Sequence, residues 1–407
     1  MAHREQPDAV YRLVERNEFD ESIELSSFAF QMDIAEQEQE RFKEELGECL
    51  LWGSFIEQKL AAQVQVFPLT VYVQGRKFAM GGVANVASWP EHRRGGLIAE
   101  LLRMALERMR SDGQTISLLT PFSIAFYRRY GWETFVERKK LTIPSHLLVR
   151  ARAYEAAGSI VRIARNDAIA ADLYERYAAR YSGMLSRSAS WWKHRIFDRR
   201  KGQLAVYLDE AGVHQGYVHY QVKNGELTVH ELAALTAQSK RAIWRFIAQH
   251  ESSIRHVTMY APADDPLPFE LGDAAIEQKL IPYYMARIVD VEAFLNQYPF
   301  SPGQRRPAAY SGYAPVVLWL EVRDEHAPWN AGIFRLTVDA DGRATVEREE
   351  GADAQVSMDI QTLTALMMGS WNTEQLHAME RIIGSDSDIE RLSAIIPRAA
   401  TFFNDFF

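Results

Sequence analysis

A strand-like run, a basic glycine loop and an amphipathic helix follow one another between Phe78 and Met109. The strand-like run, Phe78 to Ser88, returns from an earlier one, Leu60 to Val73, through the turn Gln74-Gly75-Arg76-Lys77. After the loop, apolar residues recur every three or four positions with charges between them, at Leu97, Leu101, Met104, Ala105 and Met109. Such spacing is typical of a helix with one buried face. This order predicts an α/β fold in which a loop carries the chain from a strand into a helix.

The loop Arg93-Arg94-Gly95-Gly96 stands directly before this helix. Adjacent glycines let a backbone approach a ligand closely, and the free N–H groups of a helix's first turn point toward it. The helix dipole favours negative charge there, and arginines add charge-assisted hydrogen bonds. The pattern indicates a site for an anion such as a pyrophosphate. A solvated basic loop with an ordinary glycine turn has the same residues, and the loop alone does not separate the two interpretations.

The same order of elements begins again at Ile160. The expected elements are a hairpin from Gln203 to Val222, a strand from Leu227 to Leu235, a helix near Ser239 to Gln249 and a strand from Val257 to Tyr260. Laid over the first round, the second places Thr236-Ala237-Gln238-Ser239 opposite the loop, with neither arginine nor glycine. We therefore predict an internal repeat whose second copy has lost the chemistry of its loop.

A third region begins near Ala293 and predicts a small α+β domain. Paired strands are expected from Pro315 to Val322 and from Gly332 to Val338, with a turn at Asp339–Gly342, and helical runs at Leu363–Met368, Leu376–Ile383 and Ile389–Ile396. The last seven residues contain four phenylalanines, whose exposure would forfeit burial energy, so this tail is expected to be docked. We expect three domains, at residues 1–150, 151–292 and 293–407.

Composition narrows the function classes. The 46 Lys and Arg against 54 Asp and Glu leave a net charge of -8, which argues against a nucleic-acid surface and suits cationic partners. The only cysteine, Cys49, cannot form an intramolecular disulfide, and the first eight residues mix charges without an apolar core. No stretch is long and apolar enough to span a bilayer. We expect a cytoplasmic protein with no membrane partner, and no motif predicts a metal site.

Two motifs, in order, resemble those of the GNAT N-acetyltransferases. Residues 86–98 (VASWPEHRRGGLI) resemble the acetyl-CoA loop of that family, and residues 126–132 (FYRRYGW) its later aromatic signature. More narrowly, nearly the whole chain resembles the Eis family of bacterial N-acetyltransferases; Glu231-Leu232 and Asp265–Pro268 add to this likeness. The resemblance implies a working GNAT domain, a degenerate second GNAT domain and a sterol-carrier-like α+β domain. It also implies a homohexamer that acetylates amines of polycations, such as aminoglycosides or lysine side chains, from acetyl-CoA.

The resemblance also implies roles for particular residues. Tyr127 would be the general acid that protonates the departing CoA thiolate, and the terminal carboxylate of Phe407 the general base. The cofactor-binding residues would be Val86, Ala87, Ser88, Arg93, Arg94, Gly95, Gly96, Leu97, Ile98, Ala99, Phe122 and Ser123. The sequence departs from the family where Gly95 replaces a common third arginine and where Ile98 replaces a small residue.

Several alternatives stay open from the sequence. Tyr127 is otherwise one of several packing aromatics, and the tail otherwise an apolar plug. Glu24 and Asp405 either line an acidic pocket or, as base rates favour, are solvated surface charges. The second GNAT copy is expected to bind no CoA and to wall the substrate pocket and the subunit interface. In the rival interpretation, from another class, the protein carries a lipid or other apolar ligand in its C-terminal domain.

Overall fold

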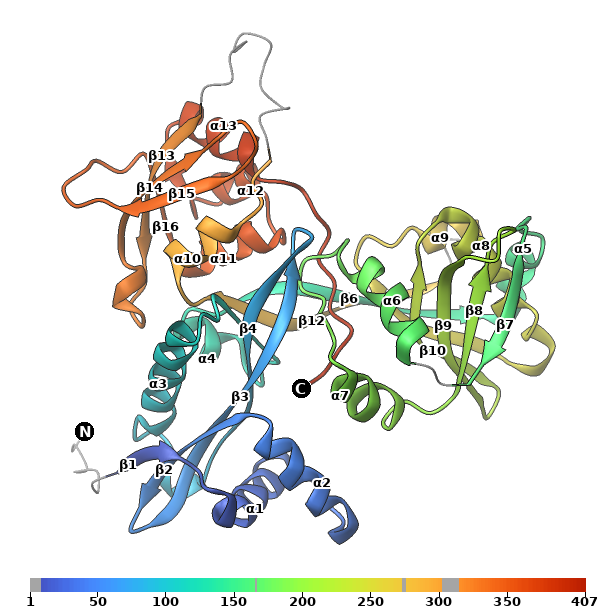
Figure 1. Ribbon diagram of the computed structural model, residues 1–407, viewed down its shortest axis with the longest axis horizontal. Coiled ribbons are helices and arrows are strands. Elements are labelled where there is room, and N and C mark those ends of the chain that lie inside the picture. The colour runs from blue at the N-terminus through green and yellow to red at the C-terminus, as the bar shows by residue number, and fades with distance from the viewer. Residues whose placement is uncertain (1–8, 165–166, 273–275, 302–314) are drawn as a thin grey trace.

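The computed structural model describes residues 9–164, 167–272, 276–301 and 315–407. Residues 1–8, the charged segment used above to predict a cytoplasmic location, lie outside the described residues. Two units share one sheet of twelve strands, and a third unit has a sheet of five strands. Figure 1 shows the first unit in blue and cyan, the second in green and yellow, and the third in orange and red. In the described part, no helix combines the length and apolarity needed to cross a membrane.

The first unit covers both faces of its strands with helices. On one face, Leu101 of α3 and Val64 of β3 are buried in the same core cluster. On the other, the side chain of Gln63 donates to the carbonyl of Ser22 in α1 at 3.3 Å. The elements are β1 (Val10–Leu13), α1 (Phe19–Phe30), α2 (Glu36–Gly47), β2 (Leu50–Ile56), β3 (Lys59–Val73), β4 (Arg76–Ser88), α3 (Leu97–Ser111), β5 (Ile116–Leu119), α4 (Ile124–Arg129), β6 (Glu133–Pro144) and α5 (Val149–Arg152). The expected hairpin and the helix beginning at Leu97 are confirmed.

The second unit repeats this plan. Its strand β10 runs parallel to β11, as β4 runs parallel to β5, and a helix follows β10 as α3 follows β4. The elements are β7 (Ser159–Ile163), α6 (Asp167–Ala178), α7 (Ala189–Trp191), η4 (Trp192–Phe197), β8 (Gln203–Leu208), β9 (His214–Lys223), β10 (Glu226–Ala234), α8 (Ala237–Ala248), β11 (His256–Pro262), α9 (Leu267–Leu271) and β12 (Glu277–Ile288). The predicted internal repeat is therefore seen in the order and pairing of the strands.

The first two units exchange their last strands. The sheet order is β1-β2-β3-β4-β5-β12-β6-β11-β10-β9-β8-β7, so β12 lies between β5 and β6 of the first unit. Met285–Ile288 pair antiparallel with residues 119–116 of β5, while β6 pairs in turn with β11. The last strand of each unit therefore pairs with a strand of the other unit. The expected domain limits at residues 150 and 292 stay predictions.

The third unit is the expected small α+β domain. It consists of α10 (Val291–Gln297), β13 (Val316–Arg323), β14 (Gly332–Val338), β15 (Ala344–Arg348), β16 (Val356–Asp359), α11 (Ile360–Met368), α12 (Thr373–Ala378), β17 (Ile383–Gly384) and α13 (Asp386–Ile395). The helix expected from Leu376 to Ile383 is wrong in its extent. It ends at Ala378, because Glu380 adopts the left-handed conformation with φ of 56°, and Ile383 then pairs with β16.

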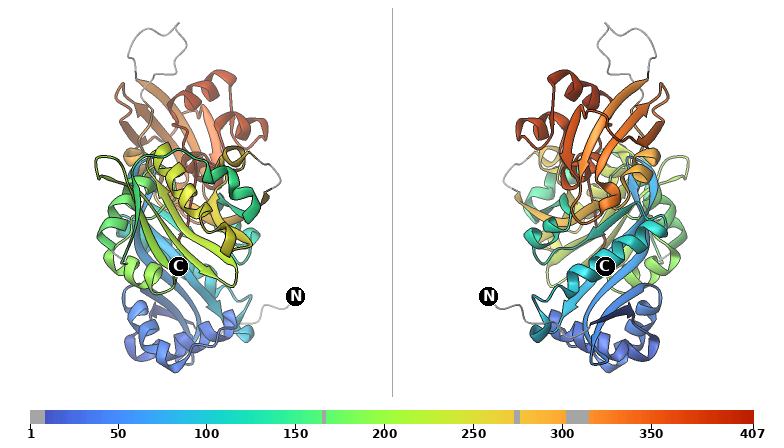
Figure 2. Two further views of the ribbon diagram at one scale, coloured as in Figure 1. Left: turned by 90° about the vertical axis from the view of Figure 1, so that its right-hand side faces the viewer. Right: turned by 90° about the vertical axis from the view of Figure 1, so that its left-hand side faces the viewer.

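The C-terminal tail leaves the third unit and runs between the other two, drawn in red in Figure 1. The two side views of Figure 2 also place its end near the middle of the molecule. Thr401 forms a parallel bridge with Ser182 of the second unit, and Phe407 is only 7% exposed. The tail is therefore docked, as predicted.

Candidate active site

Strand β4 parts from its neighbour β5 and leaves one edge of its backbone unpaired. The two strands pair only from Met80 to Val83, because β5 ends at Leu119 while β4 continues to Ser88. A β-bulge follows in β4, where Gln65 lies opposite Ala84 but Gln63 lies opposite Ala87. The splayed edge includes Val86, Ala87 and Ser88, which are the residues expected to hold the pantetheine arm.

The bulge itself was not anticipated from the sequence. Asn85 takes a φ of 50°, a conformation that asparagine tolerates better than most residues. Its side-chain oxygen accepts from Ser26 Oγ at 2.9 Å, and Ser26 Oγ accepts from Gln63 Nε2 at 2.9 Å. This chain fixes the bulge against α1. An asparagine in an otherwise apolar strand was the available signal.

The expected anion loop lies at the free N-terminus of α3. Gly96 is the N-cap, with φ of 84° and no side chain to accept from the first turn. The first helical bond runs from the N–H of Glu100 to the carbonyl of Gly96, so the amides of Leu97, Ile98 and Ala99 have no partner within the helix. A Cβ placed on Gly96 would meet no atom within 4 Å, so the space beside this N-cap is open.

Two arginines flank this free helix end. Arg93 and Arg94 are exposed, and neither forms an ion pair with any carboxylate in the described part of the chain. Arg94 adopts φ of 64°, so the turn into the helix uses the left-handed region twice, at Arg94 and at Gly96. Together with Gly95, these residues fit a bound pyrophosphate.

Tyr127 lies on the short helix α4, which begins five residues after the end of β5. Ser123 caps this helix by accepting from the N–H of Phe126 at 3.3 Å, and Phe122 precedes it with 69% exposure. The ring of Tyr127 packs against Phe122 and Phe126, with ring centroids 5.3 and 5.1 Å away. Its hydroxyl has no hydrogen-bond partner among the described residues.

Burial reinforces the neutral form of Tyr127. The side chain is 3% exposed, and burial raises the pKa of its phenol well above the ordinary value of 10. The group is therefore neutral near pH 7 and has a proton to give. The ring packs in the core, as one interpretation of the sequence expected, and the role of its hydroxyl as the general acid stays a prediction.

Phe407, at the end of the tail, packs on the sheet at β4, just before the splay. Its ring packs against Phe67, Trp191 and Tyr284, with centroids 6.1, 6.3 and 5.1 Å away. Its N–H donates to Tyr284 Oη at 3.0 Å. A Cβ placed on Gly82 would lie 2.8 Å from this ring, so glycine is required where the tail crosses β4 just before the splay.

Phe407 and Tyr127 lie in different core clusters. Phe407 and Met80 of β4 belong to one core cluster, whereas Tyr127 and Val83 belong to the cluster that includes α3. Since side chains alternate along a strand by face, Met80 and Val83 mark opposite faces of β4. The structure therefore brings Tyr127, Phe122 and Ser123 to one side of the sheet near the splay and the tail to the other.

The two acidic residues considered for the pocket have different surroundings. Glu24 is exposed on α1, as a solvated charge would be. Asp405 is 1% exposed and accepts from Arg187 Nε and Trp191 Nε1 at 3.0 and 2.9 Å. The expectation of a surface charge is wrong for Asp405, because its carboxylate is compensated by a buried arginine.

A small cavity adjoins the end of the tail. It has a volume of about 120 Å³ and lies between α2, β3 and α7. Phe67 and Trp191, which both touch Phe407, form part of its wall. The carboxylates of Glu44, Glu45 and Glu48 also line it, and Glu45 is already paired with Arg195 at 2.8 Å. Glu44 and Glu48 are exposed and remain available to a cation.

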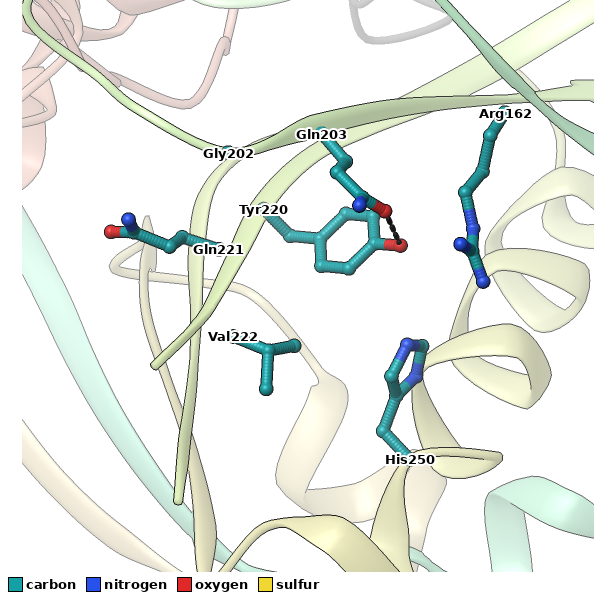
Figure 3. A pocket seen from close by; sticks show the side chains of 7 residues that line it. All are labelled: Arg162, Gly202, Gln203, Tyr220, Gln221, Val222 and His250. Carbon is teal, nitrogen blue, oxygen red and sulfur yellow. Dashed lines mark hydrogen bonds between the residues drawn. The ribbon is translucent and has the colours of Figure 1, made fainter. Parts of the chain in front are cut away.

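A separate cavity of about 510 Å³ lies in the second unit (Figure 3). Arg162 of β7, Tyr220 of β9 and His250, just after α8, line it together. The hydroxyl of Tyr220 donates to Gln203 Oε1 at 3.1 Å. The cavity contains none of the residues singled out from the sequence and is distinct from the site around the splay.

Comparisons with known families agree with this architecture. Models of the acetyltransferase (GNAT) domain match residues 10–135 and 183–288, and a model of the sterol carrier protein domain matches residues 291–404. The chain is therefore an acetyltransferase with two GNAT domains and a sterol-carrier-like domain, the third unit described above.

Relatives narrow the class further. The chain is 26% identical over 334 residues to an uncharacterized N-acetyltransferase of Streptomyces coelicolor, and 27% identical over 329 residues to the N-acetyltransferase Eis of Mycobacterium tuberculosis. Each alignment covers 76% of both chains. A probable N-acyltransferase of Enterococcus faecalis superposes with a TM-score of 0.89 at 29% identity, over 98% of this chain and 100% of that one. Eis1 of Mycobacterium abscessus shares the fold with a TM-score of 0.80 at 22% identity, over 98% and 100% of the two chains. The chain is therefore a GNAT N-acetyltransferase that is similar to Eis over about three quarters of its length.

Proposed function

We propose that the first GNAT domain transfers the acetyl group of acetyl-CoA to amines of polycationic substrates, such as aminoglycosides or lysine side chains. The observation that carries this proposal is the convergence of three features at one splay. These are the unpaired edge of β4, the open N-terminus of α3 beside Arg93 and Arg94, and the unpartnered hydroxyl of Tyr127. Each fits a different part of the same co-substrate: the pantetheine arm, the pyrophosphate and the thioester.

The residues of the chain suit a direct transfer. Acetyl-CoA supplies an activated thioester when it is bound. Backbone N–H groups of the splayed edge polarise its carbonyl while the amine nitrogen forms a bond to the carbonyl carbon. The carbon–sulfur bond then breaks, and Tyr127 gives its proton to the sulfur. The amine loses a proton to a base and a second one on forming the amide, which restores the phenol by way of solvent.

Phe407 is the proposed base. A terminal carboxylate has an ordinary pKa of about 3.5, so it is ionised at pH 7 and accepts a proton from an ammonium directly or through water. The packing of the Phe407 ring against β4 and the hydrogen bond from its N–H to Tyr284 support this role, because they fix the end of the tail beside the splay.

The acceptor class follows from charge. Three glutamates and two arginines line the cavity beside Phe407, and Glu44 and Glu48 are exposed there, while the whole chain has a net charge of -8. Both favour a substrate with several ammonium groups. A homohexamer and a cytoplasmic location belong to the same proposal, as properties expected of this family.

The second GNAT domain is proposed to bind no CoA. Helix α8 begins at Ala237, so Thr236 rather than Ser239 lies where Gly96 lies in the first domain. Thr236 Oγ1 accepts from the N–H of Ser239, and Ser239 Oγ accepts from the N–H of Thr236, both at 3.0 Å. This capping box occupies groups that α3 leaves free for a ligand.

A carrier function for the C-terminal domain is the less favoured proposal. If the C-terminal domain carried an apolar ligand in a tunnel, that function would not require the tail to end in another domain. Instead the tail leaves the third unit, crosses the second and packs its last ring on β3, β4 and β12. The course of the tail supports the enzyme.

The test is CoA-thiol release from acetyl-CoA with an aminoglycoside as acceptor, together with the product mass. Arg94→Ala is expected to raise the KM for acetyl-CoA about tenfold or more, since a hydrogen bond to a charged group contributes about 1.5–3 kcal/mol. Arg108→Ala, which removes a surface arginine of α3 paired with Asp112 just after that helix, is the matched control and should leave KM unchanged. An unaltered KM in Arg94→Ala would count against the proposed pyrophosphate site.

A further inference from the structure

A buried group of charges joins the tail to the second GNAT domain. Arg187 Nε donates to both carboxylate oxygens of Asp405, at 3.0 and 3.1 Å. The rest of its guanidinium donates to the two oxygens of Glu231, at 2.9 and 2.5 Å. The side chains of Arg187, Asp405 and Glu231 are 0, 1 and 4% exposed. One arginine thus compensates a carboxylate of the domain and a carboxylate of the tail.

Neighbouring groups complete the charge balance. Trp191 Nε1 and Tyr174 Oη donate to Asp405 at 2.9 and 3.2 Å. Burial raises the pKa of Glu231, but attraction to Arg187 and Arg200 outweighs burial and lowers it to about 2. Both carboxylates therefore need their cations, because an unpaired buried charge is strongly destabilising. This dependence ties the position of Asp405 to the second domain.

Glu231 of this group lies beside a bulge in β10. Strand β10 has a bulge at His230, since Val229 lies opposite Tyr220 while Glu231 lies opposite His219. Strand β10 also pairs with β11 only as far as Val229. In the first domain, β4 has its bulge and its splay at the corresponding point, next to the site proposed for the thioester.

The tail contacts β10 at this second splay. The carbonyl of His230, at the bulge, accepts from Asn404 Nδ2 at 3.0 Å, and Arg200 donates to the carbonyl of Asn404 at 2.5 Å. Asn404 and Asp405 thus contact the bulge and its flanking Glu231 through a direct bond and through Arg187. The feature that serves a co-substrate in one GNAT copy contacts the tail in the other.

We propose that the second GNAT domain is a receptor for the tail, and that Arg187 and Asp405 are positioning residues for the active site of the first domain. The inference rests on the proposed role of Phe407. Two residues of chain span at most about 7 Å, so fixing Asp405 confines the end of the chain. Tyr283 Oη donates to the carbonyl of Asp405 at 2.6 Å, and Tyr284 bonds the N–H of Phe407. Both tyrosines lie on β12, the strand that the second domain lends to the first.

The experiment compares the full-length protein with Asp405→Asn and Arg187→Met. The first readout does not need activity. Carboxypeptidase A is added, and the loss of Phe407 is followed by the mass of the intact protein. We expect release of Phe407 to be at least tenfold faster in both variants. In the second readout, kcat for thiol release should fall at least tenfold, while the dissociation constant for acetyl-CoA stays within twofold, because the loop before α3 is untouched.

Two further variants serve as a control and as an alternative test. Arg176→Met removes a surface arginine of the same domain, paired with Asp172, and should match the wild type in both readouts. Asn404→Ala removes the contact with the bulge and leaves the buried charges in place. It therefore tests the proposal even if the charge variants do not fold. Protection of Phe407 and kcat equal to the wild type in Asp405→Asn and Asn404→Ala would overturn the proposal.

The two proposals fail separately. If the wild type releases no thiol with any amine, the proposed function fails, while the carboxypeptidase rates still decide whether the second domain holds the tail. If the tail is released faster but kcat is unchanged, the second domain anchors the tail without positioning the active site, and the assignment of Arg187 and Asp405 as positioning residues is overturned.

Discussion

Tyr127→Phe is expected to lower kcat for acetyl transfer about 100-fold, the lower end of what a positioned general acid contributes. The substitution removes only the hydroxyl, which has no partner among the described residues, and keeps the ring that packs against Phe122, Phe126 and Trp132. The KM for acetyl-CoA and the midpoint of urea unfolding should therefore hardly change. Steady-state thiol release and urea unfolding measure the two effects.

Tyr130→Phe is the matched control for this prediction. Tyr130 lies at the end of the same helix, and its ring packs against Phe126 with centroids 5.1 Å apart. It should keep kcat within about twofold, because no proton transfer is assigned to it. Since burial raises the pKa of Tyr127 above 10, the wild type should also not lose activity through ionisation of this group below about pH 10. A Tyr127→Phe variant with more than half of the wild-type kcat would refute the assignment of the acid.

Arg287→Met is expected to destabilise the protein by about 3 kcal/mol or more, the usual effect of removing one partner of a buried ion pair. Arg287 is fully buried on β12, donates to both oxygens of Asp324 at 3.0 and 2.7 Å, and also donates to the carbonyl of Tyr130. It links the GNAT sheet to the third unit, where Asp324 also accepts from the amides of His326 and Ala327. Urea unfolding followed by tryptophan fluorescence measures the change.

Two comparisons isolate this ion pair. Arg335→Met removes a surface arginine paired with Glu347 in the third unit and should cost less than about 1 kcal/mol. The double variant Arg287→Met with Asp324→Leu should recover part of the loss, because an apolar pair leaves no uncompensated charge. A loss below about 1 kcal/mol in Arg287→Met would show that the pair does not hold the units together.

The parts of the fold that the sequence predicts are those with a local pattern. The hairpin of β3 and β4, the loop after it and the start of α3 at Leu97 follow from strand residues, glycines and helical spacing within some fifty positions. The exchange of β12 and β6 does not follow, because strand partners are chosen by contacts between residues far apart in sequence. The sequence also predicted the internal repeat, but its alignment of the two copies was shifted by three residues. It placed Ser239 opposite Gly96, whereas Thr236 is the N-cap of α8 that corresponds to Gly96.

The candidate site was predictable to a similar degree. The motifs around Arg93–Gly96 and Tyr127 predicted a co-substrate site, and the structure adds the splay of β4 and the free start of α3 between them, while the roles of these residues stay predictions. Asp405 was misjudged because charged residues are usually exposed, and its partner Arg187 lies 218 positions away along the chain. Tyr284 was missed because a tyrosine in a strand gives no local sign that its hydroxyl will hold the N–H of Phe407.

The most direct test of the central claim is thiol release by the protein extended by one glycine after Phe407. This change keeps the Phe407 ring and the contacts of Asp405, but it turns the carboxylate of Phe407 into a peptide and moves the charge about 3.8 Å along the chain. We expect kcat with an aminoglycoside to fall about 100-fold, while the dissociation constant for acetyl-CoA is unchanged. Turnover equal to that of the unextended protein would contradict the role of the tail in the active site.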